Sequence, residues 1–380
     1  MKIGIDCRNF YDAYRNEGAG IERYAYHLTK SLIARDKVND YVLFFYSDLS
    51  PEAIHRVRTG NPRVKIVKVL RRNSRLPFWD SHIKFSALLK KEKLDLTIFP
   101  ANTIPLFYRQ RSILVIHDLA IFLHPEWFPD RQWFSRRIVV PRSIRTATKI
   151  VAVSESTKLD LCRLFKTAEK KTRVIYPGVA VKEDYSASES EKVKIKFGIG
   201  ADYVLFIGTM EPRKNAVNLL KAFFNYIFEN EASHVSLVLA GIKGWKFQNF
   251  FGELSRVNQQ LVGQRVKYIG KISNRERNIL IKNCRAFVFP SLYEGFGFPV
   301  AEALALGAPV VTSDNSSLKE IGEGCAILIN PEDANDIRRG IKKALEDKVL
   351  RFQLISRGQE RARQFSWIRT AEKFVELFSD

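Results

Sequence analysis

The sequence predicts an α/β fold with two doubly wound domains. Two series of short β-branched or aromatic runs alternate with longer segments of helical periodicity, which is the pattern of βαβ units and parallel sheets. At 380 residues the chain is longer than one hydrophobic core usually supports. A polar stretch without apolar periodicity, residues 177–190, separates the two series and is the best linker candidate.

Each series supplies the strands of one predicted sheet. In the first series we expect strands at residues 2–5, 41–46, 64–69, 94–99, 113–116, 150–153 and 173–175. In the second series we expect them at residues 203–207, 235–239, 266–268, 286–289, 309–312 and 326–329. Doubly wound folds bind ligands at the carboxyl ends of parallel strands, so functional side chains are sought in the loops that follow these runs.

Composition and cysteine content favour an ordinary globular protein of the cytoplasm. Hydrophobic residues make up 46% of the chain and charged residues 27%, which argues against the disordered, collagen-like and coiled-coil classes. No uncharged apolar run reaches the ~18 residues of a spanning helix, and Asp6 comes too early for the apolar core of a signal peptide. The four cysteines are far apart and lack CxxC spacing, which argues against a zinc site or a disulfide framework.

Positive charge is concentrated in the first half of the chain. The net charge is +21, and residues 1–180 contain 33 Lys and Arg against 17 Asp and Glu. Within this half, residues 71–91 and 124–145 interleave bases with the aromatic side chains of Phe78, Trp79, Trp127 and Trp133. Such stretches fit anionic lipid headgroups, a polyanionic acceptor or nucleic acid. Solvated helix faces with inward-turned aromatics are an alternative of equal weight.

Two glutamates eight positions apart mark the loop after the predicted strand 286–289. In EGFGFPVAEALALGAPVV, Glu294 stands beside Gly295 and Gly297, and Pro299 suits the first turn of a helix, where we also expect Glu302. Glycines let backbone N–H groups approach a ligand, a helix N-terminus favours an anion, and carboxylates accept hydrogen bonds from sugar hydroxyls. This combination is what a nucleotide-sugar needs. Taken alone, each glutamate is explained by helix stabilisation or simple exposure.

A basic pair follows the predicted strand 203–207 in GTMEPRKN. Gly208 permits a tight exit from the strand, and Arg213 and Lys214 stand before a helix. The guanidinium offers a fork for phosphate oxygens and the ammonium a compact charge, so the pair can hold a diphosphate and neutralise the charge that grows on it as a leaving group. In isolation, such a pair is more often only solvated.

Two strand ends in the first half carry further candidates. Gly18 and Gly20 stand before a helix soon after the first strand, but the third glycine of a dinucleotide fingerprint is missing. His117, followed by Asp118, ends the predicted strand 113–116 and can donate a hydrogen bond to a sugar hydroxyl or transfer a proton. A histidine satisfied by local backbone is an equally weighted alternative.

Together these motifs resemble the retaining glycosyltransferases of family 4, which have the GT-B fold: two Rossmann-like domains that face each other across a cleft. The resemblance covers nearly the whole chain. It is carried by GAGIERY at residues 18–24, the His117–Asp118 strand end, VAVSESTKLDL, VIYPGV, GTMEPRKN and above all the two glutamates. It implies an acceptor-binding domain of residues 1–180, on which a helix of residues 365–380 packs back, and a donor-binding domain of residues 181–364.

The resemblance also implies roles in binding the donor. Glu302 would accept hydrogen bonds from the nucleotide ribose, and Glu294 would bear on the donor sugar, helped by backbone N–H groups around Phe296 and Gly297. The loop that begins at Gly208 would belong to the same site.

For the reacting groups, the resemblance implies that Arg213 and Lys214 clamp the diphosphate while the loop of Gly18 and Gly20 approaches it from the other domain. His117 would contact the transferring sugar. No Asp-x-Asp pair, the usual holder of a divalent ion in metal-dependent glycosyltransferases, occurs in the chain, so we expect a transfer without metal or other cofactor. Retention can use a carboxylate nucleophile, but the family is thought to react on one face of the sugar, and Glu294 is not assigned that role.

The expected donor is a GDP- or UDP-sugar, with mannose as the first choice of hexose. The expected acceptor is a saccharide or a polyprenyl- or phospholipid-linked molecule, with peripheral attachment to the inner face of the membrane. A nucleotide-sugar epimerase or a sugar phosphorylase on the same fold stays open. A dehydrogenase lacks its glycine fingerprint here, and a nucleic-acid-binding protein would leave the two glutamates without a task.

Overall fold

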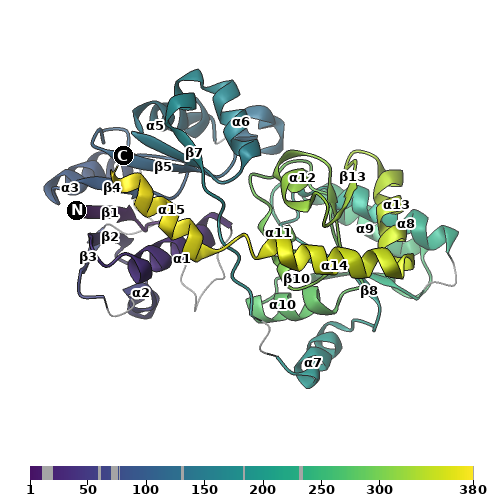
Figure 1. Ribbon diagram of the computed structural model, residues 1–380. Coiled ribbons are helices and arrows are strands. Elements are labelled where there is room, and N and C mark those ends of the chain that lie inside the picture. Colours follow the sequence, from purple (N-terminus) through teal and green to yellow (C-terminus); the bar gives the residue numbers. More distant parts are fainter. Residues whose placement is uncertain are drawn as a thin grey trace. The chain divides into compact units, whose positions relative to one another are not determined.

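The computed structural model describes residues 1–10, 20–58, 61–69, 76, 78–129, 132–182, 185–230 and 234–379. The chain forms two compact units, each with its own parallel sheet (Figure 1). The first unit comprises Met1–Pro125, Asp130–Gly178 and Phe365–Asp380. The second comprises Glu126–Pro129 and Val179–Gln364, so a short segment of the N-terminal half belongs with the C-terminal half.

The sheet of the first unit has seven parallel strands in the order β3-β2-β1-β4-β5-β6-β7. Their bounds are β1 Lys2–Asp6, β2 Asp40–Tyr46, β3 Val64–Val69, β4 Leu96–Phe99, β5 Ser112–Ile116, β6 Lys149–Ala152 and β7 Thr172–Val174. The central strands are buried along their whole length, as expected where helices cover both faces of a parallel sheet. The order reverses between β1 and β4, which places the switch point beside the carboxyl end of β1.

The helices of the first unit connect these strands. The α-helices are α1 Gly20–Arg35, α2 Pro51–Arg58, α3 Phe85–Lys91, α4 Ala120–Leu123, α5 Val140–Thr146, α6 Glu155–Leu164 and α15 Trp367–Ser379. Two π-helical segments, η1 Trp79–Lys84 and η4 Ser135–Val139, run into α3 and α5, and a 3₁₀ segment, η5 Lys166–Lys171, follows α6. Another 3₁₀ turn, η2 Pro125–Trp127, spans the point where the chain passes into the second unit.

The sheet of the second unit has six parallel strands in the order β10-β9-β8-β11-β12-β13. They are β8 Tyr203–Ile207, β9 Ser236–Ala240, β10 Val266–Gly270, β11 Ala286–Phe289, β12 Val310–Ser313 and β13 Ile327–Ile329. The helices are α7 Ala187–Phe197, the 3₁₀ turn η6 Pro212–Lys214, α8 Ala216–Glu229, α9 Gln248–Gln260, α10 Asn274–Asn283, α11 Phe298–Ala305, α12 Ser316–Gly322, α13 Ala334–Glu346 and α14 Lys348–Ala362. Because β8 and β11 are neighbours, the loops carrying Lys214 and Glu294 leave adjacent strand ends.

Every predicted strand is present, with bounds shifted by no more than two residues. The linker expectation is partly wrong, because residues 187–190 are the first turn of α7. A capping box starts that helix: the Ser186 hydroxyl accepts from the N–H of Glu189, and the Glu189 carboxylate accepts from the N–H of Ser186. The Ser-x-x-Glu pattern was legible in the sequence, but α7 has a weak apolar stripe and buries only Ser190.

The C-terminal helix α15 lies along α1 in the first unit (Figure 1). Its first residue, Trp367, packs against Gly178, where an added Cβ would lie 2.2 Å from the Trp367 nitrogen. The Thr370 hydroxyl donates to the carbonyl of Tyr176, and Arg35 pairs with Glu372. These contacts fasten α15 both to α1 and to the segment that leaves the first sheet.

Candidate active site

The strand-end loops of β8 and β11 bring the predicted cations and the first glutamate together. Glu294 stands on the loop between β11 and α11, and Gly297 ends that loop in a left-handed conformation with φ of 90°. Pro299 occupies the first turn of α11, as predicted. Lys214 ends the turn η6, which Asn215, also left-handed, joins to α8.

Glu294 accepts hydrogen bonds from both cations. Its Oε1 lies 2.5 Å from the Lys214 ammonium and 2.7 Å from the Ser291 hydroxyl, which donates to it. Its Oε2 lies 3.3 Å from Nη1 of Arg213. Among the described residues, the Lys214 ammonium donates one hydrogen bond, to Glu294. An ammonium group has three N–H donors, so two are left that can bind a ligand. The structure therefore joins three predicted site residues into one cluster.

A fourth member, Glu211, was not selected from the sequence. Its carboxylate lies 3.0 Å from Nη2 and 3.1 Å from Nε of Arg213, and only 2% of its side chain is exposed. Glu211 fixes the guanidinium in the plane that it presents to Glu294. Its place two residues before Arg213 in MEPRK was the available signal, but an acid beside bases is too common to stand out.

Burial and mutual charge shape the ionisation of this cluster. Burial lowers the pKa of Lys214, and the neighbouring Arg213 lowers it further, against the opposing pull of Glu294. Burial alone would raise the pKa of Glu294, but Lys214 and Arg213 outweigh it and hold that pKa below its usual range. For Glu211, burial prevails over the two cations and raises the pKa. Paired with acids in this way, the cations can receive an anionic ligand without an excess of buried positive charge.

The second glutamate, Glu302, is placed differently from the prediction. It lies in the second turn of α11, since the helix begins at Phe298, and its side chain is 2% exposed. Its Oε2 lies 3.5 Å from Nε of Arg277, which comes from α10. The prediction placed Glu302 in the first turn together with Pro299; the helix starts one residue before Pro299, at Phe298, which moves Glu302 to the second turn.

The loops after β8 and β9 approach each other closely at two glycines. The position that requires glycine is Gly241, and not Gly208 as the sequence suggests. A Cβ on Gly208 would meet ring atoms of Phe206 and Phe289 at 3.1 and 3.6 Å, which is tight but not prohibitive. A Cβ on Gly241 would lie 1.9 Å from the Gly208 carbonyl oxygen, and its φ is 141°. Gly241 is therefore the residue that allows the two loops to touch.

His117 lies at the carboxyl end of β5, as predicted, and is 7% exposed. Its Nε2 is 2.7 Å from the carbonyl oxygen of Pro100, so Nε2 carries the proton and Nδ1 is left as an acceptor in the neutral ring. Burial lowers the pKa of His117, against the Pro100 carbonyl and Asp118. The ring of Tyr24, from α1, meets it edge to face at 4.7 Å. The local backbone thus satisfies Nε2, which was one of the two alternatives.

The remaining predicted positions are less informative. Gly18 lies outside the described residues, and Gly20 is the exposed first residue of α1. Phe296 is buried, and its ring meets the Phe298 ring edge to face at 5.1 Å. Among the described residues no group of three or more His, Cys, Asp or Glu side chains is arranged to hold a metal ion. Within the same residues no helix is both long and apolar enough to cross a membrane.

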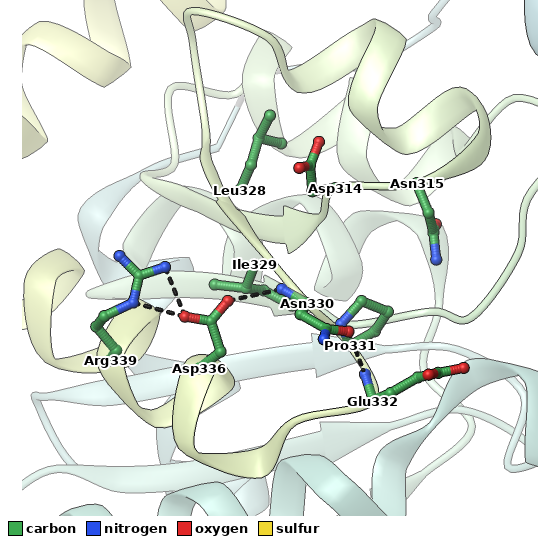
Figure 2. A pocket seen from close by; sticks show the side chains of 9 residues that line it. All are labelled: Asp314, Asn315, Leu328, Ile329, Asn330, Pro331, Glu332, Asp336 and Arg339. Carbon is green, nitrogen blue, oxygen red and sulfur yellow. Dashed lines mark hydrogen bonds and ion pairs between the residues drawn. The ribbon is translucent and has the colours of Figure 1, made fainter.

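A cavity of about 370 Å³ lies at the carboxyl ends of β12 and β13 (Figure 2). Asp314 and Asn315 follow β12 on one side, and the segment Asn330–Glu332 follows β13 on the other. Asp336 turns its carboxylate to Arg339 and to the N–H of Asn330. None of the predicted site residues lines this cavity, but Asn315 also bonds the carbonyl of Leu292 and so connects it to the Glu294 loop.

Known structures and sequences match this architecture over its whole length. A sucrose-phosphate synthase from Thermosynechococcus elongatus covers 100% of this chain and 98% of its own, with 19% identity and a TM-score of 0.77. The Anabaena HepE structure in complex with UDP-glucose covers 100% and 99%, with 20% identity and a TM-score of 0.76. The chain therefore has the GT-B fold, with two Rossmann-like domains.

Family models assign the chain to the glycosyltransferases. Residues 18–183 match Glycosyltransferase Family 4, and residues 188–361 match Glycosyl transferases group 1. The chain is 29% identical to the O-antigen chain mannosyltransferase B of Escherichia coli over 92% of both proteins. It is 27% identical to the serotype-specific mannosyltransferase WbdA of Escherichia coli, of which it spans only 42%. The chain belongs to the family 4 glycosyltransferases and is an enzyme of that class.

Proposed function

We propose that this enzyme transfers mannose from a nucleotide-diphosphate sugar, with retention of anomeric configuration and without a metal ion. The observation that carries the proposal is the cluster in which Lys214 and Arg213 converge on Glu294 at the ends of two adjacent strands. The mannosyl specificity is supported by the relatives named mannosyltransferase. The nucleotide-sugar donor is supported by the UDP-glucose bound to a protein of the same fold.

The chemistry follows from the charges in the cluster. When the sugar–phosphate bond breaks, negative charge grows on the β-phosphate, and Lys214 and Arg213 neutralise it. Their donors are held in place before the reaction by Glu294 and Glu211, so little reorganisation is needed as charge develops. Glu302 and the backbone of Phe296 and Gly297 are proposed to hold the nucleotide and sugar hydroxyls. For His117 we propose that Nδ1 accepts a hydrogen bond from a sugar hydroxyl, since Nε2 is occupied.

A donor panel tests the proposal. Purified enzyme is incubated with GDP-mannose, GDP-fucose, UDP-glucose and UDP-galactose, and released nucleoside diphosphate is measured with and without EDTA. We expect release from GDP-mannose above the others, unchanged by EDTA, and, with water as the acceptor, α-mannose as the sugar first released, observed by NMR. Release only with added Mg²⁺ would refute the transfer without a metal ion. Release from none of the nucleotide-sugars would refute the proposed class of donor. Thermal shifts with GDP, NAD and DNA separate the transferase from the dehydrogenase and nucleic-acid-binding alternatives.

We further propose that the acceptor is presented at an anionic membrane surface. The rings of Phe78 and Phe134 meet at 5.8 Å, which brings the two basic and aromatic stretches of the first unit side by side. Trp79 and Trp133 are about half exposed next to them, and the exposed Arg137 of η4 adds positive charge, whereas Lys84 is paired with Asp80 at 3.0 Å. This aromatic–basic surface has the composition of an interfacial contact. Trp127, from the same stretch, lies in the second unit.

Vesicle flotation tests the membrane proposal. The protein should float with vesicles containing phosphatidylglycerol at low salt and remain in solution with neutral vesicles. The double variant Trp79→Ser, Trp133→Ser should lose flotation, whereas Phe352→Ser, which removes a 76% exposed aromatic ring from α14, should not. A wild-type protein that stays in solution with anionic vesicles would exclude this surface as a membrane contact.

A further inference from the structure

A run of polar side chains after β12 is bonded to the backbone of the loop that carries Glu294. The Ser313 hydroxyl donates to the carbonyl of Ser291 at 2.7 Å, and Asn315 donates to the carbonyl of Leu292 at 2.9 Å. Strand pairing between β11 and β12 ends at Phe289 and Thr312, so these bonds continue the register where the sheet no longer sets it. Side chains, rather than a ladder, therefore hold the loop against its neighbour.

At Glu294 itself, both backbone groups are bonded by this run. The N–H of Glu294 donates to the Ser316 hydroxyl at 3.1 Å, and the Glu294 carbonyl accepts from the Ser317 hydroxyl at 2.9 Å. The Ser316 hydroxyl in turn donates to Oδ1 of Asn315 at 3.2 Å. With its proton directed to Asn315, the Ser316 oxygen accepts from the Glu294 N–H. Since the Glu294 N–H is used here, a ligand must take its backbone donors from later residues of the loop.

Ser316 adopts this position at a conformational cost. Its φ is 45°, in the left-handed region that residues other than glycine rarely adopt. Glycine would adopt the same φ without strain but could not bond Glu294. Ser316 is strained, and its hydroxyl accepts a hydrogen bond from the backbone of Glu294, whose carboxylate is buried and ion-paired. This combination indicates that the hydroxyl has a function other than forming the turn.

We propose that Ser316 is a positioning residue for the transfer reaction, which acts by holding the backbone of Glu294 so that its carboxylate stays between Lys214 and Arg213. The proposal rests on the function proposed above for that cluster. Loss of the bond would let the loop shift, and a shift of the carboxylate would misplace the two cations relative to the diphosphate. Ground-state affinity for the nucleotide should change little, because the Ser316 hydroxyl is engaged by the Glu294 N–H and by Asn315.

The variants Ser316→Gly and Ser316→Ala test this inference. Both remove the hydroxyl, but glycine also removes the strain, so its thermal unfolding midpoint should lie above that of the alanine variant. In both variants we expect kcat for the donor to fall about tenfold, because one hydrogen bond lost in the transition state changes the rate by about this factor. The KM should be nearly unchanged. Amide exchange of Glu294, measured by mass spectrometry, should become faster. Ser273→Ala, which removes a hydroxyl cap from α10, is the control: it should lower the unfolding midpoint and leave kcat unchanged.

Wild-type kcat in both Ser316 variants, or unchanged exchange at Glu294, would overturn the inference. Glycine adopts the φ of 45° without strain, so the kinetic comparison can be made with Ser316→Gly alone if the alanine variant does not fold. If the wild-type enzyme released nucleotide from no sugar donor, the proposed function would fail. Faster exchange at Glu294 in the Ser316 variants, and not in Ser273→Ala, would still support the positioning bond.

Discussion

At the scale of single residues, the site depends on how a few buried charges are paired. Lys214 is 12% exposed and bonded to a single carboxylate, whereas Arg213 is shared between Glu211 and Glu294. Lys214 therefore has donor capacity left for a phosphate, and Arg213 is more constrained. The two adjacent cations have different surroundings because one lies at the end of η6 and the other within it.

Lys214→Gln should lower kcat by about 10²–10³, the effect of removing one donor to developing charge. The substitution keeps a hydrogen-bond donor for Glu294 but removes the charge that the leaving diphosphate needs. Lys319→Gln, which removes an exposed lysine paired with Asp314 in the same unit, is the matched control and should leave kcat unchanged. Steady-state release of nucleoside diphosphate measures both variants. Equal rates for wild type and Lys214→Gln would remove Lys214 from the reaction.

His117 gives a prediction about stability and pH. Burial holds its pKa in the folded protein below the usual value, so between that lowered pKa and about 6.5 the unfolded chain binds more protons. Stability should therefore fall as pH drops through this window, by up to about 1.4 kcal/mol per pH unit for this one group. His82, whose pKa burial also lowers, acts in the same direction.

His117→Gln should flatten this dependence, because glutamine can donate to Pro100 but does not titrate. The free energy of unfolding from urea denaturation between pH 7.5 and 5 measures the slope for both proteins. The His82 contribution is common to both and cancels in the comparison. Identical slopes would mean that His117 is protonated equally in the folded and unfolded states.

At the scale of elements, strands were predictable from sequence and the exact helix starts were not. The central strands of both sheets are short, buried on both faces and rich in β-branched and aromatic residues, so their pattern is continuous and bounded by turn residues. The first residue of a helix is set by the backbone conformation of the single residue that precedes it. The left-handed Gly297 caps α11, so the helix begins at Phe298, one residue before Pro299, and Glu302 lies in the second turn. At α7, a cap forms the helix where the apolar pattern is weak.

Two glycines of the second unit should respond in opposite ways to the same substitution. Gly241→Ala would place a Cβ 1.9 Å from the Gly208 carbonyl oxygen at a positive φ, so it should destabilise the protein by several kcal/mol, of order 3 or more. Gly252 lies within α9 with no atom within 4 Å of an added Cβ, and Gly252→Ala should stabilise by about 1 kcal/mol through helix propensity. Thermal and urea unfolding measure both. A stable Gly241→Ala variant would mean that the β8 and β9 loops can separate.

At the scale of the whole molecule, the two-domain architecture and the three members Arg213, Lys214 and Glu294 of the cluster were predictable from the sequence. The residues that pair with the site residues were not. Arg213, Lys214 and Glu294 could be predicted because β8 and β11 end in loops rich in glycine and charge. Arg277, Ser316 and Glu211 could not, because their roles arise from contacts between loops that are far apart in sequence or from charges of common type. The assignment of Glu126–Pro129 to the second unit is likewise set by tertiary contacts.

A crystal structure of the enzyme with bound GDP or UDP tests the central claim most directly. The account predicts that the diphosphate oxygens lie within hydrogen-bond distance of the Lys214 ammonium and the Arg213 guanidinium, with ribose hydroxyls at Glu302 and no metal ion between the phosphates. A nucleotide bound away from Lys214 and Glu302, or one whose phosphates are bridged by Mg²⁺, would contradict it.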